Sequence, residues 1–241
     1  MKIRLFTIPN LLTLSNLLCG SFAALSALTY GNLSLAFGLI VLAAVFDFFD
    51  GFAARLLHQS SPIGLQLDSL ADDITFGFAP AAVLYTLYGR ATALVLPDAA
   101  WIGLLVFLFA ACAALRLARF NIDDTQRDEF LGLPSPAAAL FCASLGWIAE
   151  RYGIAFSREA VLAAALGMAV LMLVGVRMFA LKFHGFGWRG NELRYGFILL
   201  TAALLLWLGG VAVPFIILLY IVISLVRSAV CRRKNVRGLQ N

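Results

Sequence analysis

Residues 47–72 read DFFDGFAARLLHQSSPIGLQLDSLAD and place four aspartates among phenylalanines, leucines and alanines. The surrounding chain is 62% hydrophobic, so these aspartates fall in segments apolar enough to enter a membrane. Each aspartate near the centre of a membrane helix costs roughly 2.5–3.5 kcal/mol, and four of them cost on the order of 10 kcal/mol. We therefore expect the four side chains either to lie at the membrane edge or to share a neutralising partner.

The overall composition is that of an integral membrane protein. Only 13% of the 241 residues are charged, against about 25% in an ordinary soluble domain. The net charge of +5 forms no basic stripe with interleaved aromatic residues, so nucleic acid is not an expected partner. The basic start of the chain resembles a cleaved leader, but Leu17 and Leu18 occupy positions where cleavage needs small residues, so we expect a retained first helix.

Apolar runs of membrane-spanning length recur along the whole chain. They predict an all-α integral membrane protein, a bundle of about eight transmembrane helices of about 20 residues each. We expect one domain over residues 1–241, with an interfacial segment at 1–10 and a basic tail at 231–241. The predicted spans lie near 11–29, 33–56, 66–89, 99–118, 134–152, 160–181, 193–209 and 211–230. Only Gly209, Gly210 and Pro214 separate the last two, which can also be one kinked helix.

Lysine and arginine are distributed unevenly between the two sides of this predicted bundle. All 18 of them except Arg90, Arg151 and Arg158 fall at the N-terminus, in the C-terminal tail, or in the loops 56–66, 119–134 and 182–193 with their flanking helix ends. Basic residues collect in cytoplasmic loops. We therefore predict a multi-pass protein of the cell (inner) membrane, with both termini and the aspartate-bearing loop, and hence the active site, facing the cytoplasm.

The spacing of the aspartates predicts that they converge. Asp47 and Asp50 are three residues apart and Asp68 and Asp72 are four apart, so each pair shares one face of its helix. The short loop between the two helices predicts an antiparallel hairpin over residues 47–72 that brings both pairs together. Four carboxylates without a nearby histidine or cysteine suit one or two ions of Mg²⁺ or Mn²⁺.

The residues beside the aspartates suit a phosphate ligand. Gly51 leaves room for a ligand to approach the backbone, and Arg55 offers a planar fork of donors. Two other interpretations stay open. The carboxylates can pair with arginine to hold the bundle together, or they can serve a cation transporter, whose acids are expected near mid-membrane beside broken helices.

The pattern D-x2-D-G-x2-A-R-x8-G-x3-D-x3-D over residues 47–72 resembles, at every position, the signature of the CDP-alcohol phosphotransferases. The resemblance implies two ions of Mg²⁺ or Mn²⁺. Asp47, Asp50 and Asp68 would hold one ion, and Asp47, Asp68 and Asp72 would hold the other.

The same resemblance implies further roles and partners. Asp72 would act as the catalytic base, and Gly51, Arg55 and Ser61 would bind the CDP portion of the lipid donor. The protein would be a homodimer embedded in membrane lipid.

Three longer segments suggest the acceptor alcohol. IPNLLTLSNLLCG at 8–20, DSLADDITFGFAP at 68–80 and LRLARFNIDDTQRDEFLGLPSPAAA at 115–139 resemble the phosphatidylserine synthases of this superfamily. The implied reaction transfers a phosphatidyl group from CDP-diacylglycerol to the hydroxyl of L-serine and releases CMP. Glycerol 3-phosphate or another alcohol stays open as the acceptor.

Two arginines in the third of these segments fit a serine acceptor. Arg116 and Arg119, three residues apart, can face the site and bind the serine carboxylate, with Asn121 as a polar partner beside them. Alternatively, both arginines are only cytoplasmic anchors of the fourth span. Asn10 and Asn16 in the first span are further candidate polar partners.

Overall fold

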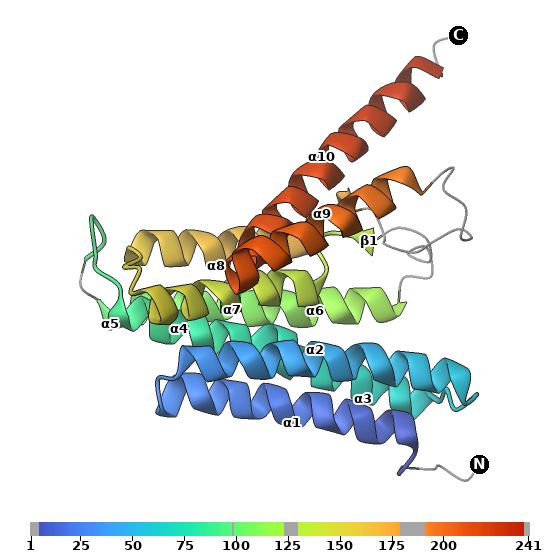
Figure 1. The fold of residues 1–241 in the computed structure, drawn as a ribbon, viewed down its shortest axis with the longest axis horizontal. Coiled ribbons are helices and arrows are strands. Elements are labelled where there is room, and N and C mark those ends of the chain that lie inside the picture. The colour runs from blue at the N-terminus through green and yellow to red at the C-terminus, as the bar shows by residue number, and fades with distance from the viewer. Residues whose placement is uncertain (1–4, 98, 123–129, 179–190, 239–241) are drawn as a thin grey trace.

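The computed structural model of the protein describes residues 5–97, 99–122, 130–178 and 191–238. Helices make up most of the described chain (Figure 1). They are α1 (Ile8–Thr29), α2 (Leu33–Leu56), α3 (Pro62–Asp72), α4 (Ala79–Arg90), α5 (Ala100–Gly103), α6 (Leu108–Ile122), α7 (Ser135–Tyr152), α8 (Arg158–Leu173), α9 (Glu192–Leu208) and α10 (Ala212–Gly238). A π-helix (Asp73–Phe78) joins α3 to α4, and 3₁₀ turns join α5 to α6 (Leu104–Phe107) and α9 to α10 (Gly209–Val211).

Every predicted span overlaps a helix or a continuous helical stretch, and the prediction of an all-α membrane protein is confirmed. Among the described residues, four stretches have both the length and the apolarity of a membrane crossing: Ile8–Thr29, Leu33–Leu56, Trp101–Ile122 and Arg194–Ser228. The stretch 62–90 carries three aspartates, and α8 has 16 residues, fewer than the roughly 20 that span a bilayer. The number of crossings therefore stays a prediction.

The predicted sixth span, 160–181, ends too late. The helix α8 stops at Leu173, and Arg177–Met178 form a short strand, β2, antiparallel to β1 (Phe130–Leu131). The carbonyl of Val176 accepts a hydrogen bond from the N–H of Gly132 at 2.9 Å. The apolar sequence gave no sign of this pairing. Its hydrogen bonds satisfy backbone N–H and C=O groups that would otherwise have been paired within a longer helix.

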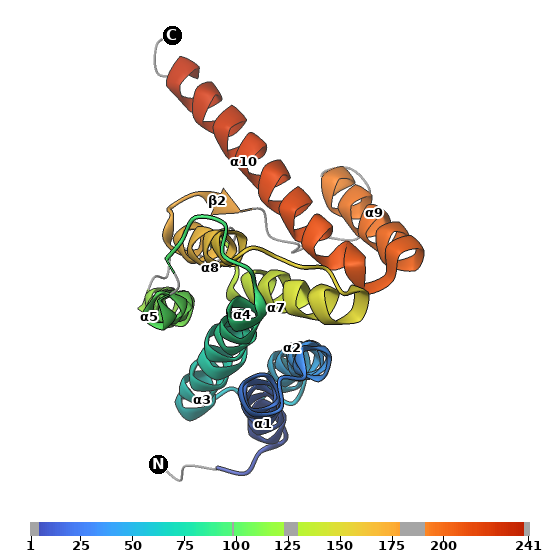
Figure 2. The same cartoon turned by 90° about the vertical axis from the view of Figure 1, so that its left-hand side faces the viewer.

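Helices extend into both ends of the chain. Residues 8–10 of the predicted interfacial segment belong to α1, and residues 1–4 lie outside the described part of the chain. The helix α10 extends through most of the predicted basic tail to Gly238. Gly209 has a φ of 57° and ends α9, and α10 then runs back beside it (Figure 2), so the last pair is two helices.

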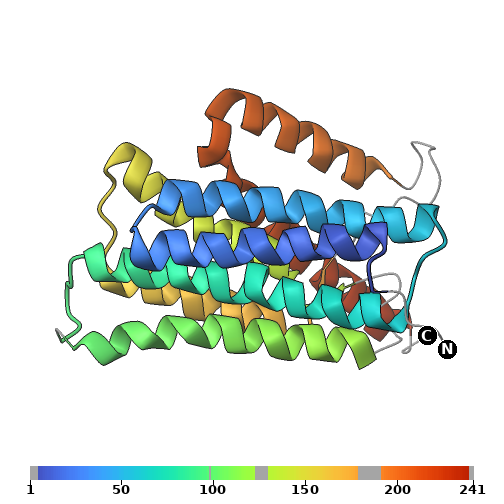
Figure 3. The same ribbon diagram turned by 90° about the horizontal axis from the view of Figure 1, so that it is seen from below.

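The helices from α1 to α8 lie side by side along the long axis of the molecule (Figure 3). Seen end-on, α1 and α2 lie beside the α3–α4 stretch, α7 packs on both α2 and α4, and α10 crosses diagonally and packs on α7 (Figure 2). The start of α1, the end of α2, the start of α3 and the end of α6 lie at one end of the bundle (Figure 3). We call this the aspartate end.

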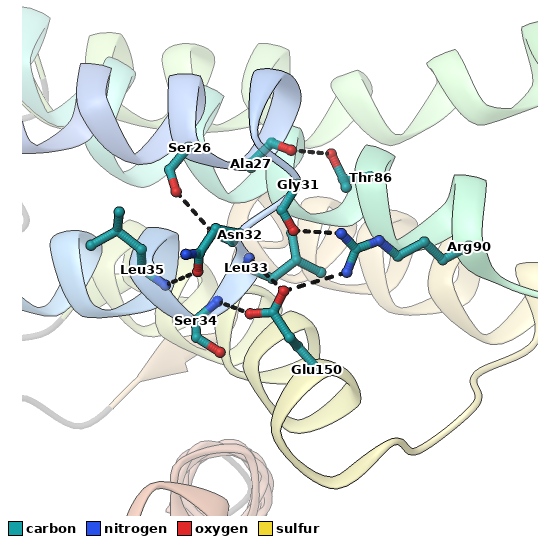
Figure 4. Close-up of polar contacts among 10 residues, drawn as sticks. All are labelled: Ser26, Ala27, Gly31, Asn32, Leu33, Ser34, Leu35, Thr86, Arg90 and Glu150. Atoms are coloured by element: carbon teal, nitrogen blue, oxygen red, sulfur yellow. Dashed lines mark hydrogen bonds and ion pairs between the residues drawn. The ribbon is translucent and has the colours of Figure 1, made fainter.

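A hydrogen-bonded cluster closes the opposite end of the bundle (Figure 4). The carboxylate of Glu150 accepts hydrogen bonds from the N–H groups of Leu33 and Ser34, at 3.3 and 2.6 Å. It also pairs with Arg90 at 3.5 Å, and Arg90 in turn donates to the carbonyl of Gly31. A negative charge at a helix N-terminus is stabilising, so the cluster fixes the start of α2 against the ends of α4 and α7.

Caps and prolines determine where the helices at the aspartate end begin. The side chain of Thr7 accepts a hydrogen bond from the N–H of Asn10 at the start of α1, and Ser61 accepts one from Gly64 at 3.1 Å at the start of α3. A proline occupies the first turn of both helices, where its missing N–H costs nothing. These starts set the positions of the polar residues that follow.

Large apolar side chains face outward over much of the surface. Phe48 is 65% exposed, Leu206 89% and Trp207 83%. In water such a surface would be unfavourable, but the hydrocarbon of a bilayer is as apolar as these side chains.

Candidate active site

The aspartates converge as their spacing predicted. One carboxylate oxygen from each of Asp47, Asp50 and Asp68 can be chosen so that all three lie within 4.8 Å of one another. Asp72 lies within hydrogen-bonding reach of Asp47. Asp50 is buried, and the other three are partly exposed. The residues 47–72 therefore form one carboxylate cluster from two helices.

The helix α1 positions both halves of this cluster. It packs against α2 and against α3, whereas α2 and α3 make few close backbone contacts with each other. The two aspartate-bearing helices are thus splayed across α1, which leaves room between their side chains. The two arms of the predicted hairpin thus both pack against this third helix.

The cluster opens onto a cavity of about 210 Å³ between the ends of α1, α2 and α3. Its lining includes the three residues predicted to bind the donor, together with several that the sequence analysis did not single out. The lining residues are Pro9, Asn10, Thr13, Asp50, Gly51, Ala54, Arg55, Gln59, Ser60, Ser61, Gly64, Leu65 and Asp68. Within the described ranges, the side-chain oxygen of Gln59 is buried there without a hydrogen-bond partner.

Two buried polar residues of α1 hold the aspartates directly. The hydroxyl of Thr13 donates to Asp50 Oδ2 at 2.6 Å and is shared with the carbonyl of Pro9 at 3.1 Å. The side-chain amide of Asn16 donates to Asp72 Oδ1 at 3.1 Å. The sequence analysis named Asn16 as a candidate partner and missed Thr13, although the two residues are three apart and share one face of an apolar helix.

An irregular turn immediately after Asp72 brings α1 close. The π-helix Asp73–Phe78 includes Thr75, which is fully buried and donates to the carbonyl of Asn16 at 3.2 Å. A Cβ atom at Gly20 would overlap the Thr75 hydroxyl, so the glycine allows this approach. Single π-turns within α-helices are frequent at functional sites.

The charge of the cluster is not balanced by basic residues. Among the described residues, no lysine, arginine or histidine lies within ion-pair distance of these four carboxylates. Like charges at this separation repel each other, and carboxylate oxygens are the ligands that hard divalent cations prefer. The arrangement of Asp47, Asp50 and Asp68 can therefore bind a metal ion.

The structure separates the candidates for the serine carboxylate. Arg116 is 8% exposed and within electrostatic reach of Asp72, whereas Arg119 is exposed on the surface of α6. Asn121 donates from its side-chain amide to the hydroxyl of Ser69 on α3 at 2.7 Å. Of the two arginines, Arg116 is thus the one that is buried and within electrostatic reach of Asp72.

Apolar side chains flank the cluster on its outer side. Phe48, Phe49 and Phe52 of α2 are 65%, 48% and 47% exposed, and two of them stand between Asp47 and Asp50 in the sequence. The carboxylates and an apolar outer surface therefore belong to the same two turns of helix.

Comparison with known proteins decides the family. The model of the CDP-alcohol phosphatidyltransferase family matches residues 6–180, which is more than half of the chain. The chain belongs to the CDP-alcohol phosphatidyltransferase family. The match extends beyond the residues 8–140 over which the sequence resembled this superfamily, and it leaves α9 and α10 outside.

Several curated relatives carry the name CDP-diacylglycerol–serine O-phosphatidyltransferase. The relative from Bacillus subtilis is 38% identical over 134 residues, which are 55% of this chain and 71% of that protein. The relative from Methanocaldococcus jannaschii is 33% identical over 70% of this chain and 72% of its own length. The relative from Mycobacterium tuberculosis is 30% identical over 92% of this chain and 76% of its own length. This family is metal-dependent, which agrees with the carboxylate cluster.

Thr13 gives the first test of the cluster in this CDP-alcohol phosphatidyltransferase. In Thr13→Val the shape of the side chain is kept, but Asp50 loses its hydroxyl donor. We expect the affinity for Mn²⁺ to fall about 10- to 100-fold, the usual effect of removing a residue that orients a metal ligand. The measurement is a Mn²⁺ titration of the purified protein followed by electron paramagnetic resonance.

Ser15→Ala is the matched control for this variant. The hydroxyl of Ser15 donates to the carbonyl of Leu11 at 2.9 Å on the exposed side of α1 and touches no carboxylate. Its loss should leave Mn²⁺ binding unchanged. An equal affinity for Mn²⁺ in Thr13→Val and Ser15→Ala would contradict the role of Thr13.

Proposed function

We propose that this chain transfers the phosphatidyl group of CDP-diacylglycerol to the hydroxyl of L-serine, giving phosphatidylserine and CMP. The observation that carries the proposal is a set of three features at the aspartate end. These are the carboxylate cluster, the cavity that Arg55 lines, and the buried guanidinium of Arg116 within electrostatic reach of Asp72. The name that the relatives carry supports the same donor and acceptor.

We assign two ions, Mg²⁺ or Mn²⁺, to the cluster. Asp47, Asp50 and Asp68 would hold one ion, and Asp47, Asp68 and Asp72 would hold the other; the position of Asp72 beside Asp47 supports the second set. When bound, such ions withdraw charge from the diphosphate, which favours attack at phosphorus and makes CMP a better leaving group.

Gly51, Arg55 and Ser61 are our candidates for holding the donor. Among the described residues, a Cβ atom at Gly51 would meet only Arg55 Nη1, at 3.8 Å, so the space beside Gly51 is open and the guanidinium borders it. A guanidinium fork matches the oxygens of a phosphate. The hydroxyl of Ser61 accepts from Gly64, so its own hydrogen can still be donated to a phosphate oxygen.

Asp72 is our candidate for the base. The amide of Asn16 donates to Oδ1 and fixes the carboxylate, which would accept the proton of the serine hydroxyl. As the proton moves to Asp72, the serine oxygen forms a bond to the phosphorus that carries diacylglycerol. The bond from this phosphorus to the CMP oxygen breaks, and CMP leaves without a covalent enzyme intermediate.

The acceptor carboxylate is assigned to Arg116. A buried guanidinium is unfavourable without an anion near it, and among the described residues Arg116 has no carboxylate within ion-pair distance. Serine supplies a carboxylate at a short distance from the hydroxyl that attacks. Arg119 and Asn121 stay candidates for further contacts at the surface of α6.

We also propose the placement of the protein in the cell. It would cross the inner membrane about eight times, each crossing taking about 20 residues, as a single catalytic domain and as a homodimer. Both termini and the active site would face the cytoplasm. The support is that Arg90 and Arg151, two of only three basic residues assigned to the other side, lie at the end opposite the aspartates. The aspartate side therefore has the larger share of lysine and arginine, as cytoplasmic loops do.

The experiment that tests the function measures CMP release from CDP-diacylglycerol by the purified protein, with and without L-serine. We expect release that depends on serine and on Mg²⁺ or Mn²⁺, with phosphatidylserine as the lipid product. Release with glycerol 3-phosphate but not with serine would reassign the acceptor. Cation flux in liposomes without any CMP release would indicate a transporter instead.

Arg116→Ala tests the assignment of the acceptor carboxylate. The lost contact is a charge-assisted hydrogen bond worth about 1.5–3 kcal/mol, so the KM for serine should rise roughly 10- to 150-fold. The KM for CDP-diacylglycerol should change little. Serinol, which has the hydroxyl and the amine but no carboxylate, should lose its disadvantage relative to serine. Steady-state kinetics with both acceptors measure the effect.

Arg116→Lys and Arg119→Ala complete this test. Lysine should restore only part of the affinity, because it offers a point charge in place of a fork. A rise in the KM for serine in Arg119→Ala alone would move the carboxylate contact to the surface of α6. If neither alanine variant changes this KM by more than about threefold, a difference below 1 kcal/mol, both arginines are only anchors.

A further inference from the structure

The N-terminus of α7 is uncapped and lies inside the protein. The helix begins at Ser135, which is fully buried, and in the described part of the chain no side-chain cap is seen at its first turn, where Pro134 is the N-cap residue. Pro136 has no N–H, and the N–H of Ala138 bonds to the carbonyl of Pro134 at 3.1 Å. The N-terminal end of an 18-residue helix carries about half a positive charge.

The guanidinium of Arg116 is directed at this helix N-terminus. Its Nη1 donates to the hydroxyl of Ser135 at 2.9 Å, and both side chains are buried. Its Nε is buried and has no hydrogen-bond partner in the described part of the chain. Two positive features thus meet at one point, and a donor among them is unused.

We propose that Arg116 and the first turn of α7 form the subsite for the carboxylate of the acceptor, with Ser135 as the residue that positions Arg116. A buried N–H without a partner costs about 1–3 kcal/mol, and a carboxylate with two acceptor oxygens can satisfy it. This inference rests on the proposed function, because it concerns the acceptor of that reaction.

The position of the subsite suits a small amino acid. Arg116 is within electrostatic reach of Asp72, the proposed base. In serine only two carbon atoms separate the hydroxyl oxygen from the carboxylate carbon, so an acceptor bound with its carboxylate at Arg116 would direct its hydroxyl toward Asp72. The subsite favours an acceptor with a carboxylate over neutral or cationic alcohols of the same size.

The test is the kinetics of Ser135→Ala with serine and with two analogues. Serinol lacks the carboxylate, and 3-hydroxypropanoate has the carboxylate and the hydroxyl but no amine. We expect the KM for serine and for 3-hydroxypropanoate to rise about tenfold, the lower end for a hydrogen bond to a charged group. The KM for serinol, the KM for CDP-diacylglycerol and kcat should stay within about twofold of the wild type.

Two variants separate positioning from a general effect on structure. Ser135→Thr keeps the hydroxyl and should restore the low KM for serine. Ser144→Ala removes the hydroxyl of another fully buried serine of α7. This hydroxyl donates to the carbonyl of Phe141 at 2.7 Å, within α7 itself. This control should leave the KM for all three acceptors unchanged.

Each outcome supports or overturns the inference. A selective rise for the two carboxylates, reversed by threonine, supports it. An unchanged KM for serine in Ser135→Ala, or an equal rise for serinol, overturns it while the proposed function stands. A wild-type protein that uses neither serine nor 3-hydroxypropanoate but releases CMP with another alcohol overturns the choice of acceptor, and the subsite with it.

Discussion

Asp68→Asn should abolish phosphatidyl transfer while the protein still folds and enters the membrane. The amide keeps the size of the side chain but removes one of the three charges that lie within 4.8 Å of each other. Metal ions contribute several kcal/mol to such reactions, so we expect turnover to fall on the order of 10³-fold, with tenfold per 1.36 kcal/mol. CMP release at saturating Mg²⁺ and Mn²⁺ is the measurement.

A second readout of Asp68→Asn does not depend on activity. Without metal, the substitution removes repulsion among like charges, so the melting temperature of the metal-free variant should equal or exceed that of the wild type. The wild type should gain thermal stability when Mn²⁺ is added, by linkage of binding to folding, and the variant should gain much less. Turnover near that of the wild type, with a normal stabilisation by Mn²⁺, would reject the metal assignment.

Asp72→Asn should lower turnover far more than it weakens donor binding. A positioned general base contributes about 10²- to 10⁴-fold to the rate, and asparagine cannot accept the proton. The carbonyl of the new side chain can still accept the hydrogen bond from Asn16, so the local structure should persist. Measurement of kcat and of the KM for CDP-diacylglycerol separates the two effects.

Asp73→Asn is the matched control for this substitution. It removes a carboxylate from the next position of the chain, where the side chain lies toward Gly77 and outside the carboxylate cluster. Turnover in this control should stay within about threefold of the wild type, less than 1 kcal/mol. If the affinity for the donor falls in proportion to turnover in Asp72→Asn, Asp72 serves mainly as a metal ligand.

The carboxylate cluster was predictable because its geometry is local. Asp47 and Asp50 lie on one helix, Asp68 and Asp72 on the next, and helical spacing with a short loop determines which faces meet. The apolar runs likewise located the helices. What they could not give was the end of α8, because the pairing of Val176 with Gly132 joins residues far apart in the sequence.

The residues that hold the aspartates in place could be identified only once the fold was known. Thr13 is 37 positions from Asp50, and only the packing of α1 under both α2 and α3 brings them together. The polar face of α1 was nevertheless visible as a repeat of three in an apolar helix. The difference between Arg116 and Arg119 was not visible, since it depends on which side of α6 faces α7.

The exposed phenylalanines beside the carboxylates determine which concentration unit applies to each of the two substrates. Under the proposed function, Phe48, Phe49 and Phe52 face the bilayer in which the donor is dissolved, while the acceptor reaches the other side of the same two turns from water. The donor then meets the enzyme by lateral diffusion, and its effective concentration is its mole fraction in the membrane plane. The concentration of serine is its molarity in the water phase, so the rate law combines a two-dimensional and a three-dimensional concentration.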